Sequence, residues 1–226
     1  MDKIVLLIDN DNIDATREAI EEYAEDDKEI KSPVKCLEWF NPVDRKFYEG
    51  EDYNFELARQ YLIEEILDQK IDVIGCDFNL HSTNKTLTYD LIETVRKFNR
   101  SASVFIYSGG MNRSTLQLFG DEGKKPAERY LKIAMSSDIS DYINNRGAIV
   151  EKVIAMLKKP SLGLQIENYL LENESLKLQH FIKEFKGKQL FEIAKEVRTQ
   201  SELGVLFCNE LVERSVSHLI DLNNYD

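Results

Sequence analysis

The first half of the chain alternates short apolar runs with longer stretches in which apolar residues recur at helical spacing. Three runs stand out, Ile4–Ile8, Ile71–Cys76 and Val104–Tyr107, and a fourth, Val34–Phe40, is more mixed. Runs of this length that are rich in β-branched residues and bounded by turn-forming residues are typical of the buried strands of a parallel sheet. Each run therefore predicts a strand.

The stretches between these runs have the pattern of amphipathic helices. Phe55–Leu67 places its apolar residues on one face, and Leu87–Phe98 does the same. Strands that alternate with helices imply right-handed crossover connections and a doubly wound sheet. We therefore predict an α/β domain with a five-stranded parallel, flavodoxin-like sheet. Its remaining elements are helices at Ile13–Ala24, Pro126–Ala134 and Ala148–Leu157 and a last strand at Ile139–Ile143.

A second unit begins near Lys158-Lys159-Pro160-Ser161, because proline cannot continue the preceding helix and every later pattern is helical. We therefore divide the chain into a first domain of residues 1–159 and a helical C-terminal module of residues 160–226. The predicted helices of this module are Leu162–Leu171, Leu176–Phe185, Leu190–Val197 and Glu202–Ile220, and Thr199-Gln200-Ser201-Glu202 has the capping-box spacing for the last of them.

The C-terminal module has more apolar residues than a unit of about 65 residues usually buries alone. Packing on the first domain, on a second copy or on a partner protein would complete its core. We therefore identify candidate partner-docking residues in the last helix, and a homodimer through the C-terminal helices is one form of this contact. These residues are Leu203, Phe207, Leu211 and Leu219.

The composition disfavours nucleic acid and membranes as partners. The 226 residues carry a net charge of −12, which opposes the attraction to phosphate on which most nucleic-acid-binding proteins depend. The three cysteines, Cys36, Cys76 and Cys208, are odd in number and lack metal-ligand spacing, which favours a reducing compartment. No run approaches the ~18 apolar residues of a membrane span, so we expect a cytoplasmic protein.

Polar side chains follow the predicted strands at the point where each strand ends. Asp9 follows the run Ile4–Ile8, Asp77 follows Ile71–Cys76, and Ser108 follows Val104–Tyr107. Because the carboxyl ends of parallel strands meet at one edge of the sheet, we expect these side chains to lie together, with His81 in a loop beside them. Such a group suits a hard cation such as Mg²⁺ and a carboxylate that accepts a phosphoryl group.

Four segments of the first domain resemble the receiver domains of bacterial response regulators: Lys3–Asp9, Ile71–Leu80, Val104–Gly109 and Asp141–Asn145. The most specific is Ile71-Asp72-Val73-Ile74-Gly75-Cys76-Asp77-Phe78-Asn79-Leu80, which is similar to the third strand and phosphorylated aspartate of that family. The resemblance implies that Asp77 is the phospho-acceptor and Ser108 the switch hydroxyl. It also implies magnesium ligands, which fall on Asp9, Asp77 and the backbone carbonyl of Asn79, with Asp11 standing in for a missing acid.

Two positions depart from the receiver pattern. Asn10 stands where the family has a second magnesium-binding acid, and Asn145 stands where it has a lysine that pairs with the phosphoryl group. Arg146, one position further on, is the nearest cation. Each change removes a charge that would stabilise one state of a phosphorylation switch, where couplings are usually ~1–3 kcal/mol. We therefore interpret the chain as a degenerate receiver that is not an enzyme and acts through protein–protein interaction, with phosphorylation at Asp77 as the rival hypothesis.

The resemblance also implies partners. Receivers are read or modified by histidine kinases or by other ATPase-containing signalling proteins, so a partner of this type is expected. Many response regulators end in a DNA-binding helix-turn-helix, which the segment from Leu190 onwards superficially resembles. Its last helix carries Glu202, Glu210 and Glu213 against the single Arg214, whereas helices that enter the major groove usually present basic or amide side chains. A DNA-binding regulator is therefore a further alternative only.

Two enzyme classes remain as alternatives for the same acids. Asp9-Asn10-Asp11 resembles the first motif of haloacid-dehalogenase phosphatases, in which one aspartate is the nucleophile and the second a general acid. That alternative would use Ser108, a lysine among Lys124, Lys125 and Lys132, and the acids Asp138 and Asp141. Asp9-x-x-Asn12 likewise resembles the opening of NYN-type nucleases, which use acids and a metal to activate water.

Overall fold

The computed structural model describes residues 2–81, 87–108, 139–179 and 182–223, with side chains up to Ser217. The chain folds into two compact units, Met1–Pro160 and Ser161–Asp226. The predicted helix at Pro126–Ala134 lies outside the described residues, as do Lys124, Lys125, Lys132 and Asp138. In the described part, no helix is long and apolar enough to cross a bilayer.

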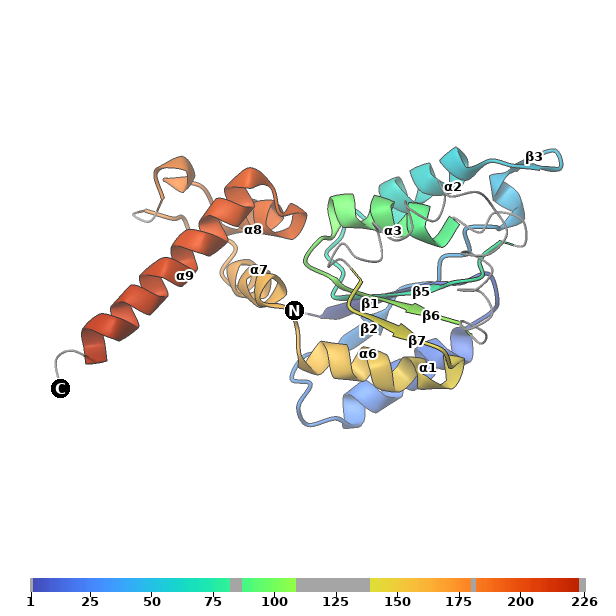
Figure 1. The fold of residues 1–226 in the computed structure, drawn as a ribbon, viewed down its shortest axis with the longest axis horizontal. Helices are drawn as coiled ribbons and strands as arrows, with labels where there is room; N and C mark the ends of the chain where they lie inside the picture. The colour runs from blue at the N-terminus through green and yellow to red at the C-terminus, as the bar shows by residue number, and fades with distance from the viewer. Residues whose placement is uncertain (1, 82–86, 109–138, 180–181, 224–226) are drawn as a thin grey trace, which may run out of the picture. The chain divides into compact units, whose positions relative to one another are not determined.

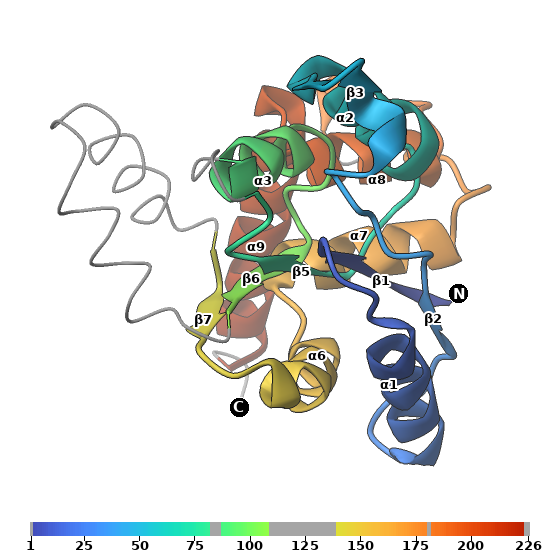
Figure 2. The ribbon, with the colours of Figure 1, turned by 90° about the vertical axis from the view of Figure 1, so that its right-hand side faces the viewer.

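The first unit is built on a five-stranded, all-parallel sheet in the order β2-β1-β5-β6-β7 (Figure 1, Figure 2). The doubly wound, flavodoxin-like α/β fold predicted from the sequence is therefore confirmed. The chain places β2 on one side of β1 and then places β5 on the other side. In sheets of this kind, ligands bind at the carboxyl ends of the two strands where the order reverses, which here are β1 and β5. The strands are β1 (Lys3–Ile8), β2 (Val34–Cys36), β5 (Val73–Asp77), β6 (Ser103–Tyr107) and β7 (Asp141–Ile143).

Helices cover both faces of this sheet. Figure 1 shows α1 (Asp14–Asp26) and α6 (Ile149–Lys158) on one face, and α2 (Phe55–Tyr61) and α3 (Leu87–Phe98) on the other. Successive residues of β1 alternate between the two apolar cores. Val5 and Leu7 face α1 and α6, whereas Leu6 and Ile8 face α2 and α3. The period-two burial explains why these runs form central strands.

Two elements differ from the sequence-based expectation. The predicted helix Phe55–Leu67 ends in a π-helical turn, Leu62–Ile66, in which the Leu67 N–H donates to the Leu62 carbonyl at 2.9 Å. Between β2 and α2, where the sequence pattern predicts neither a helix nor a strand, the chain forms a 3₁₀ turn (Arg45–Phe47) and a short hairpin of β3 (Tyr48–Glu49) and β4 (Asp52–Tyr53).

The second unit contains α7 (Leu162–Glu172), a 3₁₀ turn (Lys183–Phe185), α8 (Leu190–Thr199) and α9 (Glu202–Asn223). The predicted helix Leu176–Phe185 is wrong. The chain instead pairs with itself, because the Leu178 N–H donates to the Lys188 carbonyl at 3.0 Å and the Leu190 N–H to the Leu176 carbonyl at 2.8 Å. Gly187, with φ of +82°, makes the turn that this pairing requires.

The connection between α8 and α9 is short, since it consists of Gln200 and Ser201. Gln200 adopts a left-handed conformation. Ser201, rather than Thr199, caps the start of α9, because its hydroxyl oxygen accepts a hydrogen bond from the Gly204 N–H at 3.1 Å. The capping box lies instead at the start of α8, between Gln189 and Glu192. A buried ion pair joins α7 to α8, with Arg198 Nε 2.8 Å from a carboxylate oxygen of Glu167.

Candidate functional site

Three polar residues lie at the carboxyl edge of the sheet, where sequence reasoning expected them. Asp9 follows β1, Asp77 ends β5 and Ser108 follows β6, and each is at most 5% exposed. The parallel register sets this arrangement, because Ile8 is paired with Cys76 and Asp77 with Tyr107. The edge therefore presents two buried carboxylates from neighbouring strands.

Asp9 is the most completely bonded of these residues. One carboxylate oxygen accepts the backbone N–H of Asp11 at 2.9 Å, and the other accepts the hydroxyl of Tyr107 at 2.8 Å. The backbone N–H of Asp9 donates to the Phe40 carbonyl at 3.1 Å. Burial, followed by the charge of Asp9, raises the pKa of Tyr107, so this hydroxyl keeps its proton and serves as a donor.

Arg146 brings a positive charge into the group of acids. Its guanidinium lies 2.5 and 2.6 Å from the two oxygens of Asp9, 2.7 Å from Asp11 and 3.9 Å from Asp77. Its side chain is 38% exposed, whereas that of Asp9 is fully buried. Burial alone would lower the pKa of Arg146, but the hydrogen bond to Asp11 and the charges of Asp9 and Asp77 outweigh burial and raise it.

Arg146 reaches the acids because of the residue before it. Asn145 precedes a 3₁₀ turn (Arg146–Ala148), and its side-chain oxygen accepts the Gly147 N–H at 2.9 Å. Asn145 is therefore an N-cap, a role that a lysine at the same position could not fill. The sequence showed Arg146 only as a nearby cation. The cap preference of Asn145 could have indicated the turn that begins at Arg146, but not its contact with the acids.

Asp77 carries a strongly perturbed carboxyl group. Burial raises its pKa to about 6 and the charge of Asp9 adds to the rise, while Arg146 and the backbone N–H groups of Asn79 and Phe78 oppose it. The Thr88 hydroxyl donates to the Asp77 and Phe78 carbonyls at 2.8 and 3.0 Å, which ties the start of α3 to this loop.

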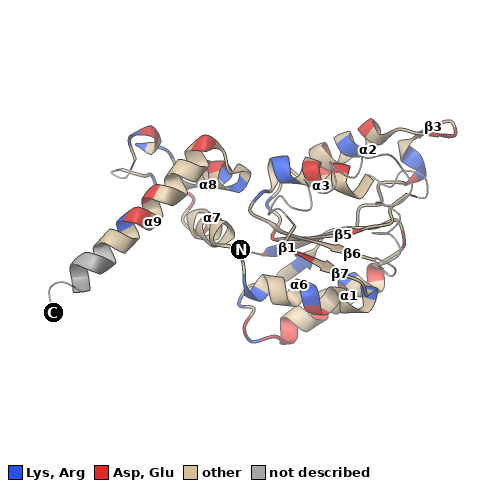
Figure 3. Ribbon diagram, in the orientation of Figure 1, with Lys and Arg blue, Asp and Glu red and all other residues tan. Residues whose placement is uncertain are grey.

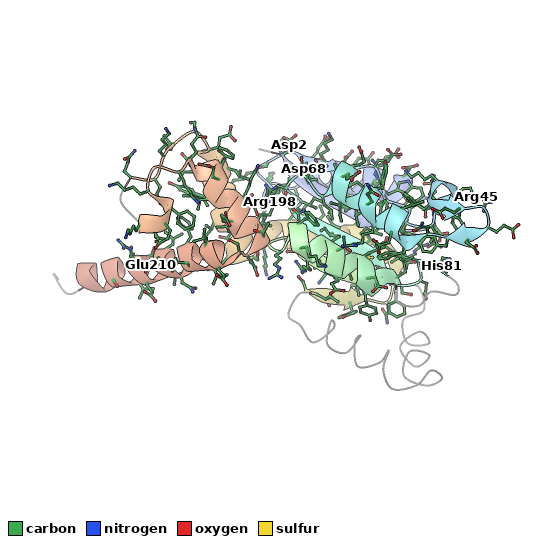
Figure 4. The ribbon with its side chains drawn as sticks, turned by 90° about the horizontal axis from the view of Figure 1, so that it is seen from above. Asp2, Arg45, Asp68, His81, Arg198 and Glu210 are labelled. Carbon is green, nitrogen blue, oxygen red and sulfur yellow. The ribbon has the colours of Figure 1, made fainter. Side chains whose placement is uncertain are left out.

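The remaining predicted site residues have structural neighbours of their own. The Asn79 side-chain amide donates to the Ser108 hydroxyl oxygen at 2.9 Å, so the predicted switch hydroxyl is anchored. Asn10 is half-buried between Asp9 and Asp11. His81, labelled in Figure 4, has its ring centroid 5.1 Å from that of Tyr53.

As arranged, the acids do not fit a magnesium ion. Both oxygens of Asp9 accept hydrogen bonds, and Asp11 and Asp9 direct oxygens at the same guanidinium rather than at a shared cavity. Among the described residues, no group of three or more acidic, histidine or cysteine side chains is arranged to hold a metal ion. Asp141 pairs instead with Lys152, whose hydrogen bond lowers the pKa of Asp141.

The docking residues predicted in α9 mostly face the core of the second unit. Phe207 is 3% exposed and its ring meets that of Phe185, with centroids 5.6 Å apart. Leu203 and Leu211 are half-buried and pack against the same core, so of these three residues Phe207 is the one whose burial leaves it no surface for docking. The side chain of Leu219 lies outside those described. Other apolar residues of α9 are exposed: Val205, Leu206, Val212 and Val216.

No protein-family model matches this chain, and no curated protein matches it.

Proposed function

We propose that the first unit is a receiver-like binding module of a signalling protein, which acts through protein–protein interaction and without catalysis. The observation that carries this proposal is the position of Arg146, whose guanidinium contacts Asp9 and Asp11 and approaches Asp77. In a working receiver, the corresponding acids would be neutralised by a divalent cation. Here a side chain of the protein supplies the positive charge.

The ion pair between Arg146 and the acids stabilises the pocket in its metal-free, unphosphorylated state. A magnesium ion would have to displace the guanidinium from Asp9, at the cost of contacts of 2.5 and 2.6 Å. Phosphorylation of Asp77 would replace a carboxylate of charge −1 with an acyl phosphate of about −2, next to the buried carboxylate of Asp9. Because a ligand shifts an equilibrium only by its differential affinity for the two states, a pocket in which Arg146 already pairs with Asp9 and Asp11 favours the unmodified form.

The proposed partner is a protein that recognises the receiver shape, of the histidine-kinase type or another ATPase-containing signalling protein. The resemblance of Ile71–Leu80 and Val104–Gly109 to receivers supports this class. The parallel sheet and its carboxyl-edge acids are compatible with it. We further propose a cytoplasmic, bacterial-type setting, which these partners would share.

Incubation with Mg²⁺ and a small phosphodonor such as acetyl phosphate, followed by intact-mass analysis, tests the proposal. We expect wild-type protein to keep its mass under conditions that modify a conventional receiver run in parallel. Asp77→Asn serves as the matched variant, since it keeps the size of the side chain and removes the acceptor. A phosphoryl adduct on wild-type protein that is lost in Asp77→Asn would overturn the proposal in favour of a phosphorylation switch.

The phosphatase and nuclease alternatives require Asp9 to meet a substrate or a catalytic metal. The full burial of Asp9 and its contacts with Tyr107 and Arg146 favour a structural role. Assays with a model phosphate ester and with single-stranded RNA separate these classes. Turnover that disappears in Asp9→Asn and persists in Asp77→Asn would support an enzyme and contradict the binding-module proposal.

A further inference from the structure

The first unit has a cavity between the segment that follows β2 and the π-helical turn that follows α2. Its volume is about 340 Å³, and its lining includes Trp39 and Phe40 of the first segment and Tyr61 and Glu65 near the end of the helix. Glu65 belongs to the π-helical turn Leu62–Ile66, and turns of this kind are frequent at functional sites. The volume lies near the lower end of the roughly 300–1,000 Å³ of ligand pockets, so the cavity suits one long side chain.

Tyr61 belongs to a cluster of three aromatic rings at this cavity. Its ring stacks on that of Phe40, with centroids 6.1 Å apart and 11° between the planes, and it meets the ring of Phe47 edge-on at 5.6 Å. Phe40 and Phe47 are each 3% exposed, whereas Tyr61 is 37% exposed. Two buried rings therefore hold Tyr61 in place while part of it stays accessible to a ligand.

A cation already lies over the Tyr61 ring. The Lys46 ammonium is 3.8 Å from the centroid of this ring and 5.1 Å from that of Phe47, within the ~6 Å over which an aromatic face attracts a cation. The Lys46 side chain is exposed, and it forms no ion pair with any residue that the structure describes. The rings therefore bind a positive charge without the help of a carboxylate.

The cavity carries more negative than positive charge. The charged residues of its lining are three acids and one base, Glu38, Asp44, Glu65 and Lys46, and Figure 3 shows basic residues on the turn before β3. Asp44 caps the 3₁₀ turn Arg45–Phe47 by accepting the Lys46 backbone N–H at 3.0 Å. Within the described part of the chain, the Glu38 and Glu65 carboxylates have neither an ion pair nor a hydrogen bond. Two acids of the cavity therefore lack an internal partner.

We infer that this cavity binds the guanidinium of an arginine side chain on a partner protein, over the Tyr61 ring and beside Glu38 and Glu65. A guanidinium suits this lining better than an ammonium, because it is planar, stacks on aromatic rings, is more weakly hydrated and pairs with a carboxylate through two parallel hydrogen bonds. It would displace Lys46, which no carboxylate holds in place. The net charge of −12 on the chain also attracts basic partners.

This docking site goes beyond the proposed function and is independent of the acids at the carboxyl edge. Its lining includes none of Asp9, Asp77 and Arg146, so each proposal can fail without the other. The acids and the tyrosine that form the site are exposed, and each contact should therefore contribute only a few-fold to affinity. The site is suited to a transient contact with one arginine rather than to a permanent interface.

Fluorescence titration of the full-length chain tests this inference, because Trp39 is the one tryptophan of the sequence and lines the cavity. The probes are acetylated triarginine amide, acetylated trilysine amide and spermidine, which carry the same charge. At low salt we expect saturable binding of triarginine, at least about threefold tighter than that of the other two. Unchanged Trp39 fluorescence would overturn the inference. Equal affinities for the three probes would also overturn it, in favour of a general site for cations.

A matched pair of acids tests the charge of the cavity. Glu65→Gln should weaken triarginine binding roughly threefold, as expected for the loss of an exposed ion pair. Glu64→Gln is the control, because Glu64 lies in the same π-helical turn, outside the lining, and accepts a hydrogen bond from Gln60 at 2.9 Å. Both glutamates are exposed, so neither change should disturb folding. Equal effects of the two substitutions would contradict binding in this cavity.

A matched pair of basic residues tests whether the ligand takes the place of Lys46. Lys46→Gln should tighten triarginine binding roughly threefold, because it leaves the Tyr61 ring free for the guanidinium. Arg45→Gln removes the same charge from the neighbouring residue, labelled in Figure 4, whose guanidinium lies over Tyr48 at 5.4 Å instead. This control should change the affinity much less. Binding that Lys46→Gln leaves unchanged, or that both substitutions tighten equally, would contradict the displacement of Lys46 from the ring.

Discussion

The substitution Asp77→Asn should stabilise the protein at neutral pH. The pKa of the Asp77 carboxyl is about 6 in the folded protein, against an ordinary value of 3.8, because burial and the neighbouring Asp9 disfavour its charged form. This difference corresponds to about 3 kcal/mol of unfolding free energy. The folded state binds more protons than the unfolded chain between these two values, so stability falls as pH rises from about 4 through about 6.

The asparagine has no proton to lose over this range and can still accept the backbone hydrogen bonds with its side-chain oxygen. We therefore expect Asp77→Asn to exceed wild type by up to about 3 kcal/mol above pH 7, with the difference shrinking towards zero near pH 4. Urea unfolding at a series of pH values, with EDTA present, measures the difference between the two proteins and cancels the titration of other groups.

Asp11→Asn provides the matched comparison. The Asp11 side chain is 62% exposed and forms one ion pair with Arg146, so the same chemical change there should cost at most about 1 kcal/mol and should not stabilise the protein. Parallel pH profiles for wild type and Asp77→Asn, or a less stable Asp77→Asn at pH 7, would refute the conclusion that Asp77 is held in a buried, unfavourable charged state.

Three further substitutions probe the same framework by urea unfolding. Arg146→Ala should destabilise the protein by roughly 1–3 kcal/mol, because it leaves the buried Asp9 uncompensated while the arginine itself is partly exposed; unchanged stability would contradict the ion pair. Tyr107→Phe should cost about 1–2 kcal/mol through the lost hydrogen bond to Asp9, and a neutral result would argue against that bond. Gly204→Ala should lower the free energy of unfolding by ~1–3 kcal/mol, since its Cβ would lie 2.1 Å from the Glu196 carbonyl oxygen. A variant as stable as wild type would show that α9 can shift away from α8.

The sheet could be predicted from the sequence because its strands are buried on both faces. Val104–Tyr107 is a continuous apolar run, Ile71–Cys76 is interrupted only by Asp72 and Gly75, and the helix Leu87–Phe98 matches its predicted bounds. The sequence-based prediction of a helix at Leu176–Phe185 was wrong, because apolar residues at helical spacing there belong to an extended segment and a 3₁₀ turn. Its backbone groups pair with residues after Gly187, a contact that depends on the turn and on the burial of Phe185 rather than on local periodicity.

The candidate site was predictable only in part. The strand ends fixed the places of Asp9, Asp77 and Ser108, since parallel strands share one edge. The contact of Arg146 with the acids depends on the path of the chain after β7 and on the Asn145 cap, which are set by tertiary structure. The hydrogen bond from Tyr107 likewise comes from the last residue of β6, where the sequence pattern indicated only a buried strand.

Calorimetric titration of Mg²⁺ into wild type and Arg146→Ala, side by side, tests most directly whether Arg146 takes the place of a metal ion. Arg59→Ala, which removes an exposed arginine paired with Glu56, controls for the loss of a positive charge. We predict no saturable binding to wild type or Arg59→Ala and saturable binding to Arg146→Ala, whose acids would be free to bind a cation. Saturable Mg²⁺ binding to wild type with an affinity equal to that of Arg146→Ala would contradict the account.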